Sequence, residues 1–243
     1  MNKVIYSALI ATCMLFLGCK EDKVQNVIKF GTSADYPPFE YYDSGKIEGF
    51  DIELARLVAK ELGKEAIFED MQFTSILAAL QSGSIDAAIS TITITQERKQ
   101  SFDFSESYHK ENLAVVYLKE QPIIEKSQLS EKKIACQLGT IMEIWLKKNV
   151  PAATVIAVDN NNQAIESLKA GHAEGVFIDG VQAKAFSANN PGLAYQIIAQ
   201  ADEGYGIAVK KESPLLNDIN TALKSLADKG ELQKLKQKWF KDN

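Results

Sequence analysis

A unit of helix, glycine and strand occurs once in each half of this sequence. The segment 76–91 (ILAALQSGSIDAAIST) aligns with the segment 164–179 (AIESLKAGHAEGVFID) when Gly83 is laid on Gly171. A helix that ends at a glycine and leads into a buried strand is one step of an alternating α/β arrangement. Two copies of the unit predict two similar lobes, each with its own sheet.

Both copies end on a polar residue, Thr91 in the first and Asp179 in the second. Ligands of open α/β sheets bind at the carboxyl ends of the strands. Two sheets that face each other would therefore bring Thr91, Thr93 and Arg98 opposite Asp179. The repeat predicts a binding site between the two lobes.

Strands alternate with helices along the rest of the chain, which predicts mainly parallel sheets flanked by helices. The strands are expected at 27–32, 66–69, 85–90, 113–118, 134–137, 154–158, 175–178, 196–199 and 205–209. The helices are expected at 50–62, from Thr74 or Ser75 to 81, from Thr95, from 139–140, from Asn160 or Asn161 to 170, from Pro214, and at 231–240.

Arg98 lies in the first turn of the helix expected after Thr95, where a positive charge opposes the helix dipole. A nearby anion would account for it, because a guanidinium binds a carboxylate through two parallel hydrogen bonds. A surface arginine paired with Glu97 or Asp103 is the alternative, and the local sequence leaves both open.

The composition excludes several classes of function. Hydrophobic residues make up 46% of the 243 residues, which is ample for cores, and the net charge is −5 without a basic block. Nucleic acid is therefore not an expected partner. His109 and His172 are the only histidines, too few for a Cys/His metal cluster, and Cys136 lies in an apolar run that predicts a buried, inert thiol.

The first residues are read as a targeting segment and not as part of the fold. Lys3 precedes an apolar run at 5–17, and Gly18-Cys19 follows it. This pattern resembles a bacterial lipoprotein signal at 1–18, with Cys19 as the lipidated first residue of the mature chain and 19–26 as a tether. Secretion without lipidation is the alternative.

An arginine on one lobe and an acid on the other suit a zwitterion. Arg98 is expected to bind an α-carboxylate, and Asp179, the Thr93 hydroxyl and the Ser90 carbonyl an α-ammonium. Tyr36, on a loop just before Pro37 and Pro38, and Phe73 are candidates to sandwich the ligand's side chain, and a cationic side chain would gain cation–π energy there. Core packing is the alternative for both rings.

Several runs carry a resemblance to a known family: 32–63 (TSADYPPFEYYDSGKIEGFDIELARLVAKELG), 85–98 (IDAAISTITITQER), 103–105 (DFS), 205–211 (YGIAVKK) and 237–240 (QKWF). In this order they resemble the family 3 solute-binding proteins of bacterial ABC importers, which bind polar amino acids. The resemblance covers essentially all of the expected mature chain.

The resemblance implies a two-lobed periplasmic-binding-protein fold of type II with two hinge crossovers. The first lobe would comprise 27–109 and 203–243, and the second 110–202. The lobes would close around one small ligand, and the protein would dock onto a membrane permease. No cofactor or metal and no catalysis are implied; a periplasmic or cell-surface monomer, anchored through Cys19, is expected.

Carried over position by position, the resemblance implies three groups of site residues. The carboxylate would be bound by Arg98, Thr93, Thr140 and Ile141, and the ammonium by Asp179, Ser90 and Thr93. The ligand's side chain would meet Tyr36, Phe73, Ser33, Thr91, Gln137 and Glu40.

Two positions depart from the family pattern. Ser33 stands where several binders of cationic amino acids have aspartate, and Ile141 where a second threonine is common. Arginine or a related cationic amino acid is the first expectation for the ligand, and glutamine or another polar amino acid the second.

Two other classes of function are weighed against transport. An enzyme on the same fold, similar to a cyclohexadienyl dehydratase, needs a general acid, for which Glu143, Glu203 or His109 would be the candidates. A sensory or adhesive surface domain is the other alternative.

Overall fold

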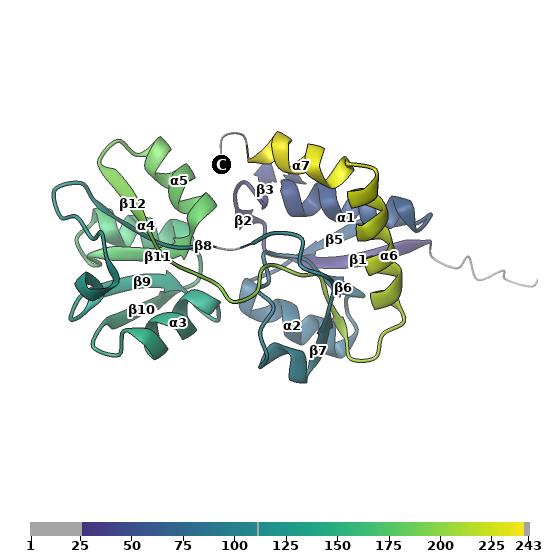
Figure 1. Cartoon of the computed structure of the whole chain (residues 1–243), viewed down its shortest axis with the longest axis horizontal. Helices are drawn as coiled ribbons and strands as arrows, with labels where there is room; N and C mark the ends of the chain where they lie inside the picture. Colours follow the sequence, from purple (N-terminus) through teal and green to yellow (C-terminus); the bar gives the residue numbers. More distant parts are fainter. Residues whose placement is uncertain (1–25, 111, 241–243) are drawn as a thin grey trace, which may run out of the picture.

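The computed structural model describes residues 26–110 and 112–240, which form two α/β lobes on either side of two crossings of the chain (Figure 1). The two-lobed α/β fold expected from the sequence is confirmed. The predicted signal peptide, Cys19 and most of the tether lie outside the described residues.

The first lobe contains a five-stranded sheet built from both ends of the chain. Across the sheet the strands are β5 (Glu65–Asp70), β1 (Val27–Thr32), β6 (Ala87–Ala88), β13 (Ala208–Lys210) and β7 (Phe102–Phe104). Its helices are α1 (Phe50–Glu61), α2 (Phe73–Ser82), α6 (Leu215–Asp228) and α7 (Glu231–Trp239). Helices α1, α6 and α7 contact one another, and α2 contacts β1, β6 and β13.

The second lobe contains a five-stranded sheet from one continuous segment. Across the sheet the strands are β10 (Thr154–Val158), β9 (Lys133–Gln137), β11 (Gly175–Asp179), β8 (Asn112–Leu118) and β12 (Leu193–Gln200). Its helices are α3 (Ile141–Asn149), α4 (Asn161–Lys169) and α5 (Gly180–Asn189), with a 3₁₀ turn η2 (Lys126–Leu129).

Both sheets are mixed rather than mainly parallel. In the first, β1 runs parallel to β5 and β6, whereas β13 runs antiparallel to β6 and β7. In the second, β9 runs parallel to β10 and β11, whereas β8 runs antiparallel to β11 and β12. The antiparallel strands are those beside the crossings, where the chain enters or leaves a lobe without an intervening helix.

The chain passes between the lobes twice, from β7 to β8 and from β12 to β13. Tyr205 of the second crossing forms an isolated bridge with His109 of the first crossing and another with Thr93 of the first lobe. The lobe boundaries predicted at 109/110 and 202/203 fall within these two crossings.

The repeated unit occupies equivalent places in the two sheets. Gly83 ends α2 with a φ of 84°, and Gly171 follows α4 with a φ of 75°. Strand β6 then enters the middle of the first sheet, and β11 the middle of the second. Glycine is required at both turns because other residues are strained in the left-handed region.

Some elements differ from the sequence expectation. The segment after Thr95 forms only a 3₁₀ turn, η1 (Arg98–Gln100), because β7 begins at Phe102; the Thr95 hydroxyl nevertheless accepts from the Arg98 N–H at 3.1 Å. Helix α2 begins at Phe73, before either expected cap. The expected strand 85–90 is reduced to the two residues of β6.

Other elements were not expected. Helix α5 follows Asp179 directly, and its apolar side chains do not collect on one face. A small antiparallel sheet follows β1 and contains β2 (Asp35–Tyr36), β3 (Glu40–Asp43) and β4 (Lys46–Glu48). The prolines at 37 and 38 hide this sheet in the sequence, because proline disfavours a strand reading.

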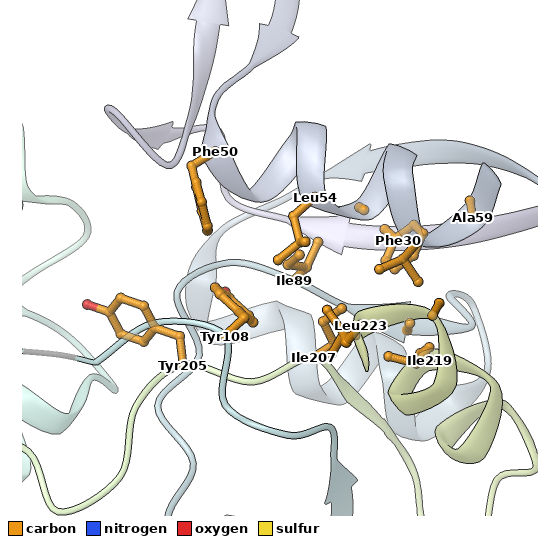
Figure 2. Packing of buried hydrophobic residues seen from close by; sticks show 14 of the residues in the cluster. Phe30, Phe50, Leu54, Ala59, Ile89, Tyr108, Tyr205, Ile207, Ile219 and Leu223 are labelled. Carbon is orange, nitrogen blue, oxygen red and sulfur yellow. The ribbon is translucent and has the colours of Figure 1, made fainter. Parts of the chain in front are cut away.

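Each sheet is covered on both faces by buried apolar side chains. In the first lobe one cluster joins α1 to α6, including Phe30, Leu54, Ile219 and Leu223 (Figure 2), and another lies under α2.

Cys136 is buried in the core of the second lobe, and burial raises the pKa of its thiol to about 12, which agrees with the predicted inert thiol. Within the described residues, no helix is both long and apolar enough to cross a membrane.

Ile219 tests the contribution of the first cluster to stability. Replacing it by alanine should lower the free energy of unfolding by about 2–5 kcal/mol, because a fully buried aliphatic side chain leaves a cavity. The same change at Ile124, which is 59% exposed, should cost less than about 0.5 kcal/mol. Urea denaturation measures both, and equal losses would contradict the described core.

Candidate functional site

A narrow cavity of about 10 Å³ lies where the two lobes meet, and side chains from both lobes line it. The first lobe contributes side chains from β2, from the start of α2 and from the loop after β6. The second contributes the end of β9 and the start of α3. The lining residues are Tyr36, Phe73, Thr91, Thr93, Arg98, Gln137, Thr140, Ile141, Met142 and Tyr205.

The volume of this cavity matches about one water molecule. An amino acid fits only if the lining groups of the two lobes move apart. A larger hollow of about 530 Å³ adjoins it, shares Thr93 and Ile141 with it, and is bounded by Gln200–Glu203 of the second crossing. The contact between the lobes is therefore loose beside the crossing, which leaves room for such a movement.

Arg98 bridges the two lobes. Its Nη1 donates to the Thr93 carbonyl of the first lobe at 2.7 Å, and its Nη2 donates to the Gly139 carbonyl of the second at 3.1 Å. The guanidinium carbon lies 6.0 Å from the centre of the Phe73 ring. Asp103, which the sequence left open as a partner for Arg98, forms an ion pair with Lys211. Arg98 is therefore directed to the space between the lobes.

The start of α3 faces Arg98 across the cavity. Its N-cap, Thr140, makes no side-chain capping bond, and the Thr140 hydroxyl donates to the Gln137 carbonyl at 2.7 Å. The N–H groups in the first turn of a helix have no partner within the helix and favour an anion. Thr140 and Ile141 thus place an anion-binding helix end beside the guanidinium of Arg98.

Thr91 adopts an unusual backbone conformation, with a φ of 46°. A β-branched residue in this left-handed region costs about 1–3 kcal/mol and needs support from its surroundings. The Asp51 carboxylate accepts from the Thr91 N–H at 2.8 Å, and the Glu40 carboxyl accepts from the Ser90 hydroxyl at 3.0 Å. Two buried acids therefore hold the segment that forms the first lobe's side of the site.

Asp179 does not line the cavity. It is fully buried at the start of α5, where its Oδ1 accepts from the Val181 and Gln182 N–H groups at 2.7 and 3.2 Å. Its Oδ2 accepts from the Tyr205 hydroxyl at 3.0 Å. Burial raises the pKa of Asp179 from 3.8 to about 6. Asp179 thus caps α5 and lies one residue behind the wall that Tyr205 forms.

Three further residues proposed from the sequence also lie behind the wall. The Ser33 N–H donates to the Ser90 hydroxyl oxygen at 3.0 Å, and the Ser33 hydroxyl contacts Asp35. Glu40 is fully buried. Ser33, Ser90 and Glu40 are absent from the lining because their polar groups bind one another.

Two lining residues were not proposed from the sequence. Tyr205 belongs to the 205–211 run noted for the family resemblance, so its position offered a signal. Figure 2 shows its hydroxyl directed away from the other labelled side chains of the cluster. Met142 follows Ile141 in the first turn of α3 and offered no separate signal.

Comparisons with known proteins agree on one family. Residues 28–242 match the family model of the bacterial extracellular solute-binding proteins, family 3. The arginine-binding extracellular protein ArtP of Bacillus subtilis is 36% identical, over 96% of both chains. The L-cystine-binding protein TcyJ of Escherichia coli K12 is 33% identical, over 90% of this chain and 84% of its own.

Solved structures agree in fold. An ancestral arginine-binding protein bound to arginine superposes with a TM-score of 0.84 at 39% identity, over 88% of this chain and 98% of its own. A structure of an ancestral arginine-binding protein bound to glutamine gives the same TM-score at 40% identity and the same coverage.

Tyr205→Phe should destabilise the protein by about 1–3 kcal/mol, because it removes a donor from a buried carboxylate. The native pKa of Asp179 lies above its ordinary value, so its contribution to stability is lost as the pH rises from about 3.8 to about 6. Without the Tyr205 donor that pKa rises further, and the loss of stability continues above pH 6.

The difference in unfolding free energy between wild type and Tyr205→Phe should thus be larger at pH 8 than at pH 5. Urea denaturation at the two pH values measures it. Tyr42→Phe, at a ring that is 54% exposed, is the control. A difference that shrinks towards pH 8 would contradict the contact between Tyr205 and Asp179.

Proposed function

The chain belongs to the bacterial extracellular solute-binding proteins, family 3, and from this premise we propose that it is the extracytoplasmic subunit of an ABC importer that binds a polar amino acid, with arginine favoured. The observation that carries the proposal is the guanidinium of Arg98 beside the uncapped start of α3, at a cavity lined by both lobes. The two groups together suit one carboxylate.

The ligand's carboxylate is assigned to Arg98, Thr93, Thr140 and Ile141. Binding requires the Gly139 carbonyl to release the guanidinium, so the carboxylate replaces a contact that already joins the lobes. A charge-assisted hydrogen bond contributes about 1.5–3 kcal/mol, and micromolar affinity needs about 8 kcal/mol. A few such bonds with aromatic burial suffice.

The ammonium is assigned to Asp179, with the Thr93 hydroxyl and the Ser90 backbone carbonyl; it is the Ser90 hydroxyl that Ser33 and Glu40 bind behind the wall. Asp179 reaches the ligand when the Tyr205 hydroxyl yields its place on Oδ2, since Tyr205 itself lines the cavity. A bound ammonium would favour the ionised carboxylate, whose pKa burial otherwise raises to about 6.

The ligand's side chain is assigned to the space between Tyr36 and Phe73, with Thr91 and Gln137 as polar neighbours. A guanidinium between two rings gains cation–π energy, which supports arginine. Ser33 and Glu40 are no longer assigned to this group, because they lie behind the wall. Glutamine is the second candidate, since a similar ancestral arginine-binding protein is described with glutamine bound.

The enzyme alternative finds no general acid among the three residues considered for it. Glu203 forms an ion pair with Lys99, and Glu143 accepts from the Gly139 N–H and pairs with Lys147. His109 is stacked on Tyr205, and burial lowers its pKa to about 4. We therefore propose that the protein binds its ligand without catalysis. We also propose, from the family resemblance, that it is a monomer that docks onto a permease.

The membrane anchor belongs to the same proposal. Cys19, as the lipidated first residue after removal of 1–18, would hold the protein at the periplasmic or cell surface. Incorporation of a labelled fatty acid into wild type and its loss in Cys19→Ser test this assignment; labelling of both, or of neither, would contradict it.

Arg98→Ala should reduce the affinity for L-arginine and L-glutamine at least about 30-fold, because both ligands present the same carboxylate. Isothermal titration calorimetry measures both affinities. Arg56, the only other arginine in the sequence, lies on the surface beside Glu48 and supplies the matched control, Arg56→Ala. Unchanged affinity in Arg98→Ala would contradict the carboxylate assignment.

Asp179→Asn separates the two roles of this residue. Asparagine caps helices as well as aspartate, so the stability should change by less than about 1 kcal/mol. The affinity for L-arginine at pH 7 should fall at least about tenfold, because the charge that faces the ammonium is lost.

The pH dependence gives a second readout. The wild-type affinity should weaken as the pH falls below about 6, where Asp179 takes up a proton, and the affinity of Asp179→Asn should not. The control is Asn160→Asp, a reverse exchange at the N-cap of α4 in the same lobe. Wild-type affinity in Asp179→Asn would contradict the ammonium assignment.

A further inference from the structure

Two acids of the first lobe are buried side by side without a basic partner. Glu40 lies on β3 and Asp51 on α1, and both are fully buried. None of the ion pairs in the described part of the chain includes either residue. A third acid, Asp35, raises the pKa of Glu40 further.

Each carboxyl uses one oxygen to hold the 90–91 segment. Asp51 Oδ2 accepts from the Thr91 N–H and from the Tyr108 hydroxyl, both at 2.8 Å. Glu40 Oε1 accepts from the Ser90 hydroxyl at 3.0 Å and from the Thr91 hydroxyl at 3.4 Å. The pair therefore contacts the backbone and both hydroxyls of the two residues that precede Ile92.

The remaining oxygens, Glu40 Oε2 and Asp51 Oδ1, are buried and find no donor among the described residues. Both carboxyls contact Thr91, so the two groups lie together, and the charge of Asp51 raises the pKa of Glu40. Ionised carboxylates only accept hydrogen bonds, so a bond between them requires a proton on one of them. Two adjacent buried carboxyls keep one proton because both cannot ionise together.

We propose that Glu40 and Asp51 share one proton, and that this acid–carboxylate pair is the positioning element of the ligand site, holding Ser90 and the left-handed Thr91 in place. The part that concerns the ligand rests on the proposed function; the shared proton does not.

The proton belongs mainly to Glu40. Asp51 accepts two short hydrogen bonds, from an N–H and from a phenol, and these favour its charged form. Burial nevertheless raises the pKa of Asp51 to about 7, and burial together with the Asp51 charge raises that of Glu40 well above its usual range. Glu40 as the donor gives every oxygen of the pair a partner.

The pH dependence of stability tests the shared proton. The native pair holds a proton that the unfolded chain has lost above the ordinary carboxyl range, so the wild-type folding constant should fall as the pH rises from about 5 to 7. In Glu40→Gln the amide replaces the donated proton, and this part of the slope should disappear.

Relative to Glu40→Gln, the folding constant of wild type should fall by a further factor that approaches ten per pH unit, because the difference corresponds to one proton. Asp35 and Asp179 contribute equally to both proteins. Glu65→Gln, at an exposed residue of β5, should keep the wild-type slope. Equal slopes in wild type and Glu40→Gln, measured by urea denaturation, would overturn the shared proton.

A double-mutant cycle gives an independent test. Glu40→Gln and Asp51→Asn should each be tolerated, because one amide supplies the donor that the shared proton supplied. In the double variant two amide NH₂ groups face each other, and its folding constant should be at least tenfold lower than the single effects predict. Additive effects would contradict a single shared donor.

The affinity for L-arginine tests the positioning role. Glu40→Gln should bind within threefold of wild type, whereas Glu40→Leu, which removes the bonds to Ser90 and Thr91, should lose at least tenfold. Wild-type affinity in Glu40→Leu, or an equal loss in a folded Glu40→Gln, would overturn this role. If Glu40→Leu does not fold, the comparison of Glu40→Gln with wild type decides it.

If wild type binds no amino acid, the proposed function fails, while the pH slopes and the mutant cycle still decide the shared proton.

Discussion

The guanidinium of Arg98 donates to one carbonyl from each lobe, and the rest of the site is arranged around this bridge. On the first lobe the bridge requires the chain after β6 to run through Thr93, and on the second it requires the turn at Gly139 before α3. The first segment follows β6, the middle strand of its sheet, and the second follows β9, an interior strand of the other sheet. Both lie at the carboxyl ends of strands, where ligands of α/β sheets bind. A charged group that joins two lobes through neutral carbonyls can exchange them for a stronger acceptor.

The architecture could be predicted from the sequence because it depends on local features, namely turn glycines and the spacing of apolar residues along helices. Gly83 and Gly171 mark equivalent turns, and the apolar spacing of α1 and α6 predicts helices that cover a sheet. Helix α5 was missed because Asp179, its N-cap, was read only as a ligand residue, and because no apolar face follows it. The same aspartate serves a helix end and is proposed to serve the ligand, and sequence spacing reveals only one such role at a time.

The lining of the cavity was predicted in part. Arg98, Thr93 and the start of α3 line it, and so do the two aromatic side chains Tyr36 and Phe73. Glu40 was interpreted as a residue for the ligand's side chain. Its burial depends on the turn that brings β3 against α1, and on the contact with Asp51 that this turn produces. Tertiary contacts of this kind leave no periodic trace in a sequence.

The first lobe takes its strands from both ends of the chain, whereas the second comes from one continuous stretch. During synthesis the whole sheet of the second lobe emerges from the ribosome before β13, α6 and α7 exist. The second lobe can then complete its core early, whereas Phe30 and Leu54 of the first lobe stay uncovered until Ile219 and Leu223 have been synthesised. The second lobe can therefore complete its core before the first, although the first lobe begins earlier in the chain. A nascent chain that stops before α6 would present an uncovered apolar face to chaperones and proteases.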